Sequence, residues 1–265
     1  MRRASIAVLG AILIVLLCAD WIAPFPYERQ FRADVAVPPC RPYRLGTDAL
    51  GRDRLSRLIY GGRVSMVLAP LAALLAVALA LLAGLTAGCL GGWWERVVTT
   101  ATDLCLSLPW LFLLLAARAM LPLNAGPATS IVITFGLLGL LGWAGPSRIL
   151  LAAVKRHQRS DFVLLARSEG CPPWRIALVQ ILPNLRPVAA AQFWVTAPAF
   201  LLSEANLGLL GLGVAEPAPS WGNLLREMEN LSAVARNPWI AAPLVALVMV
   251  VSCFQVAIST GDFEA

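Results

Sequence analysis

Six apolar stretches follow one another along the chain, and each is long enough to cross a lipid bilayer as a helix. A crossing of the hydrocarbon core, about 30 Å thick, needs about 20 mainly apolar residues. The composition agrees, because 59% of the 265 residues are apolar and only 14% are charged, against about 25% charged in soluble domains. We therefore predict an all-α membrane protein with about six transmembrane helices, at residues 4–23, 64–90, 97–121, 128–151, 188–210 and 239–258.

Histidine, cysteine and lysine usage exclude several kinds of chemistry. His157 is the only histidine and the six cysteines form no C-x-x-C pair, so we predict no metal site and no Ser-His hydrolase inside the membrane. Lys155 is the only lysine and Arg156 follows it, which excludes a P-loop of the Gly-Lys-Ser/Thr type. We expect no enzyme activity and no catalytic residue. Arginines at membrane ends explain the net charge of +6 without a nucleic-acid partner.

The polar loop at residues 152–187 is the most informative segment. An amphipathic run reaches Glu169, Gly170 can end it as a helix, and a second short run opens at residues 172–173 and is stopped by Pro183. We expect a helix-turn-helix on the membrane face that can insert into the groove of a partner protein. The apolar residues available for this insertion are Phe162, Ala166 and Trp174.

This loop resembles the coupling loop, with its Glu-Ala-Ala motif, of the permeases of binding-protein-dependent ABC transporters. The matching positions are Ala166, Gly170 and the run at residues 181–184. Residues 45–65 resemble the segment before the second helix of the C-type permeases in dipeptide, oligopeptide and nickel importers. Residues 207–214 and 217–222 resemble the segment after the fifth helix of the same permeases. The three blocks occur in the family's order and cover the chain nearly end to end.

The resemblance implies one inner-membrane subunit of a type I ABC importer, which forms a translocation path and couples to a cytoplasmic ATPase. The implied partners are a homologous permease subunit, two ABC ATPase subunits, an extracytoplasmic substrate-binding protein and the lipid bilayer. ATP and Mg would belong to the ATPases, with no cofactor on this chain. The expected cargo is a di- or oligopeptide, and nickel or a metal chelate is the alternative within the family. A self-contained secondary transporter is the alternative outside it, although internal repeats or broken helices are typical of that class.

The layout expected from the resemblance has three parts: an N-terminal transmembrane helix at 1–23, an extracytoplasmic loop with an interfacial helix at 24–62, and a five-helix permease core at 63–265. The first run starts like a signal peptide, but its length and its lack of a small-x-small cleavage site favour a retained helix. Counting crossings puts the coupling loop and both termini on one side, which the resemblance implies is the cytoplasm. The arginines are divided evenly between the two sides, so charge alone does not set the orientation.

The candidate site residues fall into three groups. The coupling loop contributes Asp161, Ala166, Glu169, Gly170, Trp174, Arg175, Leu182 and Pro183. Ionisable or small residues in or beside the spans are candidates for the pathway or its gate, namely Glu204, Asp103, Gly208 and Gly211. The candidates for docking of the binding protein are Arg52, Asp53, Arg54 and Arg57.

Two of these groups carry open alternatives. The arginines between residues 52 and 57 could instead meet lipid headgroups from an interfacial helix, or form internal ion pairs. Asp103 could pair with Arg96 rather than line a pathway. In the coupling loop, Leu164 and Leu165 stand where the family usually has the glutamate of its motif, a departure that would weaken coupling or tune it to one ATPase.

Overall fold

The computed structural model describes residues 2–122 and 126–259. The regular elements among them are helices, and the only β-pairings in these ranges are two isolated bridges, Gln30 to Arg52 and Thr47 to Asp53. The predicted all-α class is confirmed. The elements are α1 (Arg2–Leu17), α2 (Ala19–Ile22), α3 (Arg54–Leu90), α4 (Gly92–Ser107), α5 (Trp110–Ala119), α6 (Pro127–Leu141), α7 (Ala144–Gln158), α8 (Asp161–Ser168), α9 (Pro173–Arg175), η1 (Ile176–Ile181), α10 (Leu182–Asn184), α11 (Arg186–Leu209), α12 (Trp221–Leu225), η2 (Arg226–Glu229), α13 (Leu231–Arg236), η3 (Pro238–Ala241) and α14 (Ala242–Ser259).

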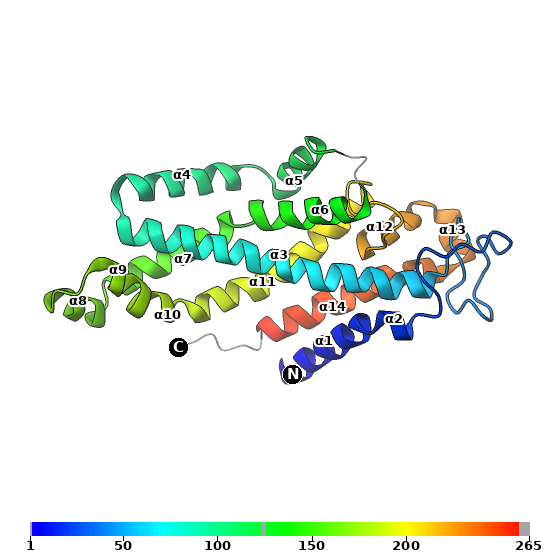
Figure 1. The fold of residues 1–265 in the computed structure, drawn as a ribbon, viewed down its shortest axis with the longest axis horizontal. Helices are drawn as coiled ribbons and strands as arrows, with labels where there is room; N and C mark the ends of the chain where they lie inside the picture. The colour runs from blue at the N-terminus through cyan, green and yellow to red at the C-terminus, as the bar shows by residue number, and fades with distance from the viewer. Residues whose placement is uncertain (1, 123–125, 260–265) are drawn as a thin grey trace.

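The long helices run roughly along one axis, with α3 through the middle of the molecule (Figure 1). Helices α8, α9 and α10 lie at one end, which we call the α8 end and define as residues 159–185. The loop before α3, together with α12 and α13, lies at the other end, which we call the α12 end and define as residues 24–57 and 211–240 (Figure 1). The two ends are therefore separated by the length of α3.

Three helical segments are long and apolar enough to cross a membrane unbroken, at residues 54–90, 127–158 and 238–259. Two bent pairs raise the number to five if each pair is one span, at residues 92–119 and 173–209. The first helix is apolar but shorter, at Arg3–Leu17. Each predicted apolar stretch consists mainly of helix, although some are broken, and the sixth crossing stays a prediction.

Helix α3 begins ten residues earlier than the apolar pattern predicts. Asp53 is its N-cap, with a side chain that accepts hydrogen bonds from the Ser56 backbone N–H at 2.8 Å and from Ser56 Oγ at 2.7 Å. An N-cap carboxylate of this kind satisfies backbone donors that have no partner within the helix. The helix expected at the membrane interface within residues 24–62 is therefore absent: residues 24–53 hold no helix, and residues 54–62 are the first turns of α3.

Proline explains the sharper of the two bends. Pro109 stands between α4 and α5, whose axes differ by 92°. A residue before proline is pushed out of the helical region, and Leu108 is extended, with φ −91° and ψ 136°. The single third span expected at residues 97–121 is therefore two helices that meet at this proline.

The interior is packed with small side chains along α3. Ala69, Ala73, Ala76 and Ala80 are fully buried there. Helices in lipid gain no hydrophobic drive from one another, so small residues that allow close packing are favoured at their contacts. The prediction that the Gly84–Gly88 region packs within a bundle is confirmed, because a methyl group on Gly88 would lie 2.4 Å from the Val154 side chain of α7.

Candidate functional site

The α8 end is a helical hairpin closed by one glycine. Gly170 has φ +77°, in the left-handed region that favours glycine. Its N–H donates to the Arg167 carbonyl at 3.1 Å, and the Cys171 N–H donates to the Ala166 carbonyl at 3.0 Å. These two bonds form a Schellman motif, which ends α8 and turns the chain. The predicted helix end at Gly170 is confirmed.

One face of α8 is buried and the other is apolar and exposed. Val163 and Ala166 point inward, into a cluster that joins α8 to α3, α7 and η1. Phe162, Leu164 and Leu165 point outward, and Leu165 is 60% exposed. Together with Asp161 and Ser168 these three residues line an open hollow of about 540 Å³. The hairpin is thus fixed from behind and presents an apolar surface in front.

The candidate coupling residues divide between these two faces. Asp161, Glu169, Gly170, Trp174 and Arg175 are exposed. The remaining members are buried or partly buried, namely Ala166, Leu182 and Pro183. The prediction that Ala166 inserts into a partner is wrong, because its side chain packs inward against the rest of this chain. The outward-facing leucines were noted in the sequence only as departures from the family motif.

The prediction that Pro183 stops the second run is wrong. The turns continue through a π-helix, η1, into α10, and α11 follows at an angle of 54°. In the wider π turn, the Leu182 N–H donates to the Ala177 carbonyl five residues before it. Single π turns of this kind commonly mark functional positions in helices. The hairpin is therefore joined to the α11 span by continuous helical turns with one bend.

At the α12 end, two buried arginines hold two carboxylates. Arg52 Nε lies 2.6 Å from Asp48 Oδ2, and Arg52 Nη1 lies 2.5 Å from Glu216 Oε2. Arg57, 1% exposed, binds the other Glu216 oxygen through Nη2 at 2.8 Å. Burial alone would lower the pKa of Arg52, but the carboxylates of Asp48 and Glu216 outweigh burial and raise it.

This arrangement decides among the alternatives for the arginines between residues 52 and 57. Arg52, Asp53 and Arg57 are all buried, so they meet neither lipid headgroups nor a docking protein, and the docking prediction is wrong for these three. Arg52 and Arg57 belong to an internal ion-pair cluster, and Asp53 caps α3. The carboxylate of Glu216, 159 residues after Arg57, was not singled out in the sequence, because no local pattern links residues so far apart.

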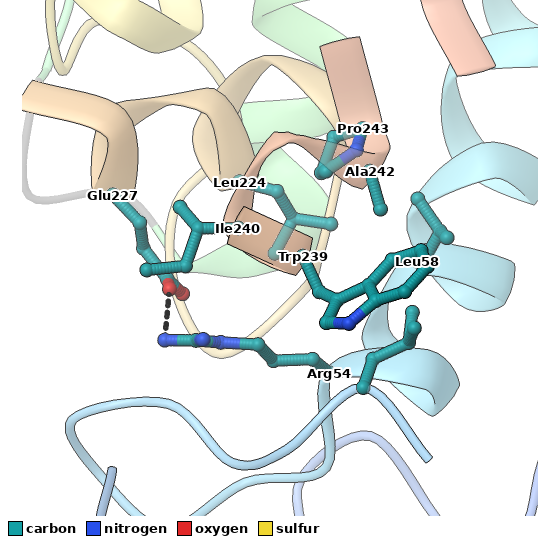
Figure 2. A pocket seen from close by; sticks show the side chains of 9 residues that line it. Arg54, Leu58, Leu224, Glu227, Trp239, Ile240, Ala242 and Pro243 are labelled. Atoms are coloured by element: carbon teal, nitrogen blue, oxygen red, sulfur yellow. Dashed lines mark ion pairs between the residues drawn. The ribbon is translucent and has the colours of Figure 1, made fainter. Parts of the chain in front are cut away.

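Arg54 takes a separate partner, as Figure 2 shows. Its Nη2 lies 2.8 Å from Glu227 Oε2, beside a small apolar pocket that Leu58, Leu224 and Trp239 help to line. Burial raises the pKa of Glu227, and the positive charge of Arg54 opposes that shift. The pair connects the first turn of α3 to η2 and so ties two segments of the α12 end together.

Glu204 forms a fully buried connection between three helices. Ser65 Oγ of α3 donates to Glu204 Oε2 at 3.0 Å, and the Trp221 N–H of α12 donates to the same Ser65 Oγ at 3.1 Å. Four residues further along α11, a methyl group on Gly208 would lie 2.2 Å from the backbone of Gly222. The backbones of α11 and α12 are therefore in direct contact beside this carboxylate.

These contacts revise the expected pathway and gate residues. Glu204 is 0% exposed, so in this conformation its carboxylate touches no solvent and holds α12 against α3. Gly208 allows α11 and α12 to pack closely. Gly211, with φ +71°, ends α11 in a second Schellman motif. Asp103 is half exposed and lies 3.6 Å from Arg148, so its charge partner is Arg148 and not the alternative partner Arg96.

Comparison with known proteins gives this architecture a family. Residues 61–260 match the family of binding-protein-dependent transport system inner membrane components. That match runs from the second turn of α3 to the end of α14 and includes the hairpin and the Glu204 connection. The chain belongs to this family. It is accordingly a multi-pass transport permease of the membrane rather than an enzyme, and the resemblance of its motifs to this family is confirmed.

Named relatives cover most of this permease. It is 30% identical over 255 residues to the oligopeptide transport system permease protein of Haemophilus influenzae, across 95% of this chain and 79% of that protein. It is 32% identical over 251 residues to the di/tripeptide transport system permease protein of Pseudomonas aeruginosa, across 88% of this chain and 78% of that protein. It is 29% identical over 266 residues to the oligopeptide transport system permease protein of Mycobacterium tuberculosis, across 98% of this chain and 88% of that protein.

Proposed function

We propose that this permease is one of two membrane subunits of an ATP-driven importer for di- or oligopeptides. The named relatives are peptide permeases that align along nearly the whole chain, which supports a peptide as the cargo. The translocation path would run between this subunit and a homologous permease. An extracytoplasmic binding protein would deliver the peptide at the α12 end.

The observation that carries the proposal is the exposed apolar face of α8. Surfaces of this kind mark contacts with other proteins, and a helix laid into a groove is a common mode of recognition. We infer that Phe162, Leu164 and Leu165 dock on a cytoplasmic ATPase, with Trp174 beside them. ATP and Mg would be bound by the ATPases alone, since this chain has no Gly-Lys-Ser/Thr sequence.

Closure of the two ATPases on ATP would then move the hairpin. The π turn and the bend before α11 join the hairpin to a membrane-spanning helix, so a shift of α8 would be transmitted to α11 and to the Glu204 connection. This is the kind of small helix displacement from which alternating access is built. The α8 end would face the cytoplasm, and an even number of crossings would put both termini there.

A pull-down tests the docking surface. The tagged full chain is purified in mild detergent, and the accompanying chains are identified for wild type, Leu165→Arg and Leu231→Arg. Leu231 is 80% exposed at the opposite end and serves as the matched control. We expect an ATPase with wild type and with Leu231→Arg, and its loss with Leu165→Arg. Equal recovery of the ATPase with all three proteins would contradict the proposal that this face of α8 docks on the ATPase.

The cargo needs its own measurement. The assembled complex and its binding protein are reconstituted in vesicles, and ATP-dependent uptake of labelled dialanine is compared with uptake of labelled nickel. We expect dialanine uptake that stops without ATP. Nickel uptake without peptide uptake would indicate that the cargo is nickel. Uptake that does not depend on ATP would indicate a secondary transporter.

A further inference from the structure

A cavity of about 450 Å³ opens at the α12 end, between the loop before α3 and the segment that follows α11. Its volume is typical of small-molecule sites, which span about 300–1,000 Å³. Positive charge is in surplus by two, because five arginines and three carboxylates line the cavity. These residues are Arg52, Arg54, Arg57, Arg226, Arg236, Asp48, Glu216 and Glu227.

The most buried arginine of the wall has donors to spare. Arg57 uses Nη2 for Glu216, but its Nε and Nη1 have no hydrogen-bond acceptor among the described residues. Its nearest other carboxylate oxygen, Asp48 Oδ2, lies 3.8 Å from Nε. Buried polar groups are normally hydrogen-bonded, and a guanidinium offers five donors in a planar fork. Two buried donors behind the wall therefore lack an acceptor in this conformation.

The rim of the cavity is also basic. Arg226 and Arg236 are exposed, and neither forms an ion pair within the part of the chain that the structure describes. Apolar atoms from Leu50, Ala233 and Ile240 line the cavity between these charges. A ligand with one negative end and a short apolar body would meet complementary surfaces here.

Glu216 shows how this wall holds a carboxylate. Its two oxygens lie 2.5 Å from Arg52 Nη1 and 2.8 Å from Arg57 Nη2, while half of its side chain is exposed. Paired bonds from guanidinium groups to the two oxygens of a carboxylate are strong and directional. Glu216 therefore shows, within this chain, the contact between arginines and a carboxylate that a ligand would make.

We propose that this arginine-lined cavity binds the carboxylate of a small ligand, and that the ligand is the carboxyl end of a short peptide. The second part rests on the proposed function. Guanidinium forks match a terminal carboxylate in shape and charge, and the apolar lining suits small side chains next to it. An acidic side chain of the binding protein also carries a carboxylate, but a single side chain would fill only a small part of a cavity of about 450 Å³.

Direct binding tests the proposal. Full-length permease, purified in detergent with its accompanying subunits, is titrated with dialanine and with dialanine amide, which lacks the carboxylate. We expect dialanine to bind and the amide to bind at least tenfold more weakly. Equal binding of acid and amide, or no binding of dialanine, overturns the proposal.

Variants locate the binding to the cavity. Arg226→Gln combined with Arg236→Gln removes only exposed rim charges, so the fold should survive, and the melting temperature checks this. Dialanine affinity should fall at least tenfold in this variant. It should stay unchanged in Arg32→Gln, which alters an exposed arginine of the same end that does not line the cavity. Unchanged affinity in the rim variant overturns the proposal.

Two further readouts separate this proposal from the proposed function. Dialanine uptake into vesicles without direct binding overturns the cavity site and leaves peptide import standing. Direct binding without uptake supports the cavity site and counts against peptide import. If the rim variant loses the binding protein but keeps its affinity for dialanine, the carboxylate belongs to that protein and the small-ligand proposal is overturned.

Discussion

The α12 end and the α8 end of this permease treat charge and apolar surface in opposite ways. At the α12 end, the buried arginines Arg52 and Arg57 bind the carboxylate of Glu216, which lies more than 150 residues later in the sequence. At the α8 end, large apolar side chains point outward and Gly170 closes the turn. The first end pairs most of its buried charge within its own chain, whereas the second leaves large apolar side chains exposed, a surface typical of contacts with other molecules.

The difference indicates how stability and the proposed coupling are divided between the two ends of the molecule. Buried ion pairs fix one arrangement of segments, because removing a partner leaves a charge without compensation. An exposed apolar face contributes little to folding and is available for binding. Substitutions at the α12 end should therefore affect the fold first, and substitutions on the outer face of α8 should affect partners first.

The largest effect is expected for Arg52→Gln. This change leaves the buried Asp48 carboxylate without its closest cation and releases one oxygen of Glu216. Breaking a buried ion pair costs about 3–5 kcal/mol, so the melting temperature in detergent should fall steeply. Arg32→Gln, an exposed arginine of the same end, is the control. Equal melting of the two variants would show that the internal cluster does not stabilise the fold.

The second-largest loss of stability is expected for Gly208→Ala. The added methyl group meets the Gly222 backbone at 2.2 Å, and backbone atoms cannot rotate away as a side chain can. Overpacking costs about 1–3 kcal/mol, and we expect the upper end of that range, with a loss of folded yield in size-exclusion chromatography. Gly136→Ala in α6 is the matched control, since nothing lies within 4 Å of its added methyl group. A normal yield for Gly208→Ala would contradict the direct contact between α11 and α12.

A smaller effect is expected for Gly170→Ala at the other end. Alanine meets no neighbour there, but it must adopt φ +77°, at a cost of about 1–2 kcal/mol. Gly170→Asn should cost less, because asparagine tolerates the left-handed region better. Thermal melting and ATPase recovery are measured for both variants. If alanine and asparagine behave alike, the backbone conformation is not what matters at this turn.

The smallest change in stability is expected for Leu164→Glu, which places the usual family residue at an exposed position. Surface substitutions typically stay within about 0.5 kcal/mol, so the melting temperature should not move. ATPase recovery should fall several-fold, because a carboxylate in an apolar contact loses its hydration. If more ATPase is recovered with Leu164→Glu than with wild type, the groove of the partner ATPase accommodates a glutamate at this position.

The apolar pattern predicted the helical class and the place of every long helix, because lipid demands about 20 apolar residues for each crossing. It missed the true start of α3, since polar residues 54–57 belong to the same helix as the apolar run. Asp53 followed by Ser56 was the available signal, as an N-cap residue before a helix. The bend at Pro109 was also readable from proline alone.

The site was less predictable than the fold. Gly170 was predicted correctly, because a left-handed turn after a helix has a local sequence signature. The inward direction of Ala166 and Arg57 was not, since it depends on which neighbouring elements cover each helix face. Glu216 and Ser65 escaped notice because their importance comes only from partners more than 130 residues away.

The unbroken length of α3 has a mechanical consequence. At about 1.5 Å per residue, its 37 residues make a rod of about 55 Å, with the ion-pair cluster at one tip and the base of the hairpin near the other. Tilting such a rod by about 5° around its middle moves each tip by about 2.4 Å in opposite directions. If the hairpin is pushed by a partner as proposed, a rigid tilt of α3 would move the arginines at its other tip by a similar distance in the opposite direction.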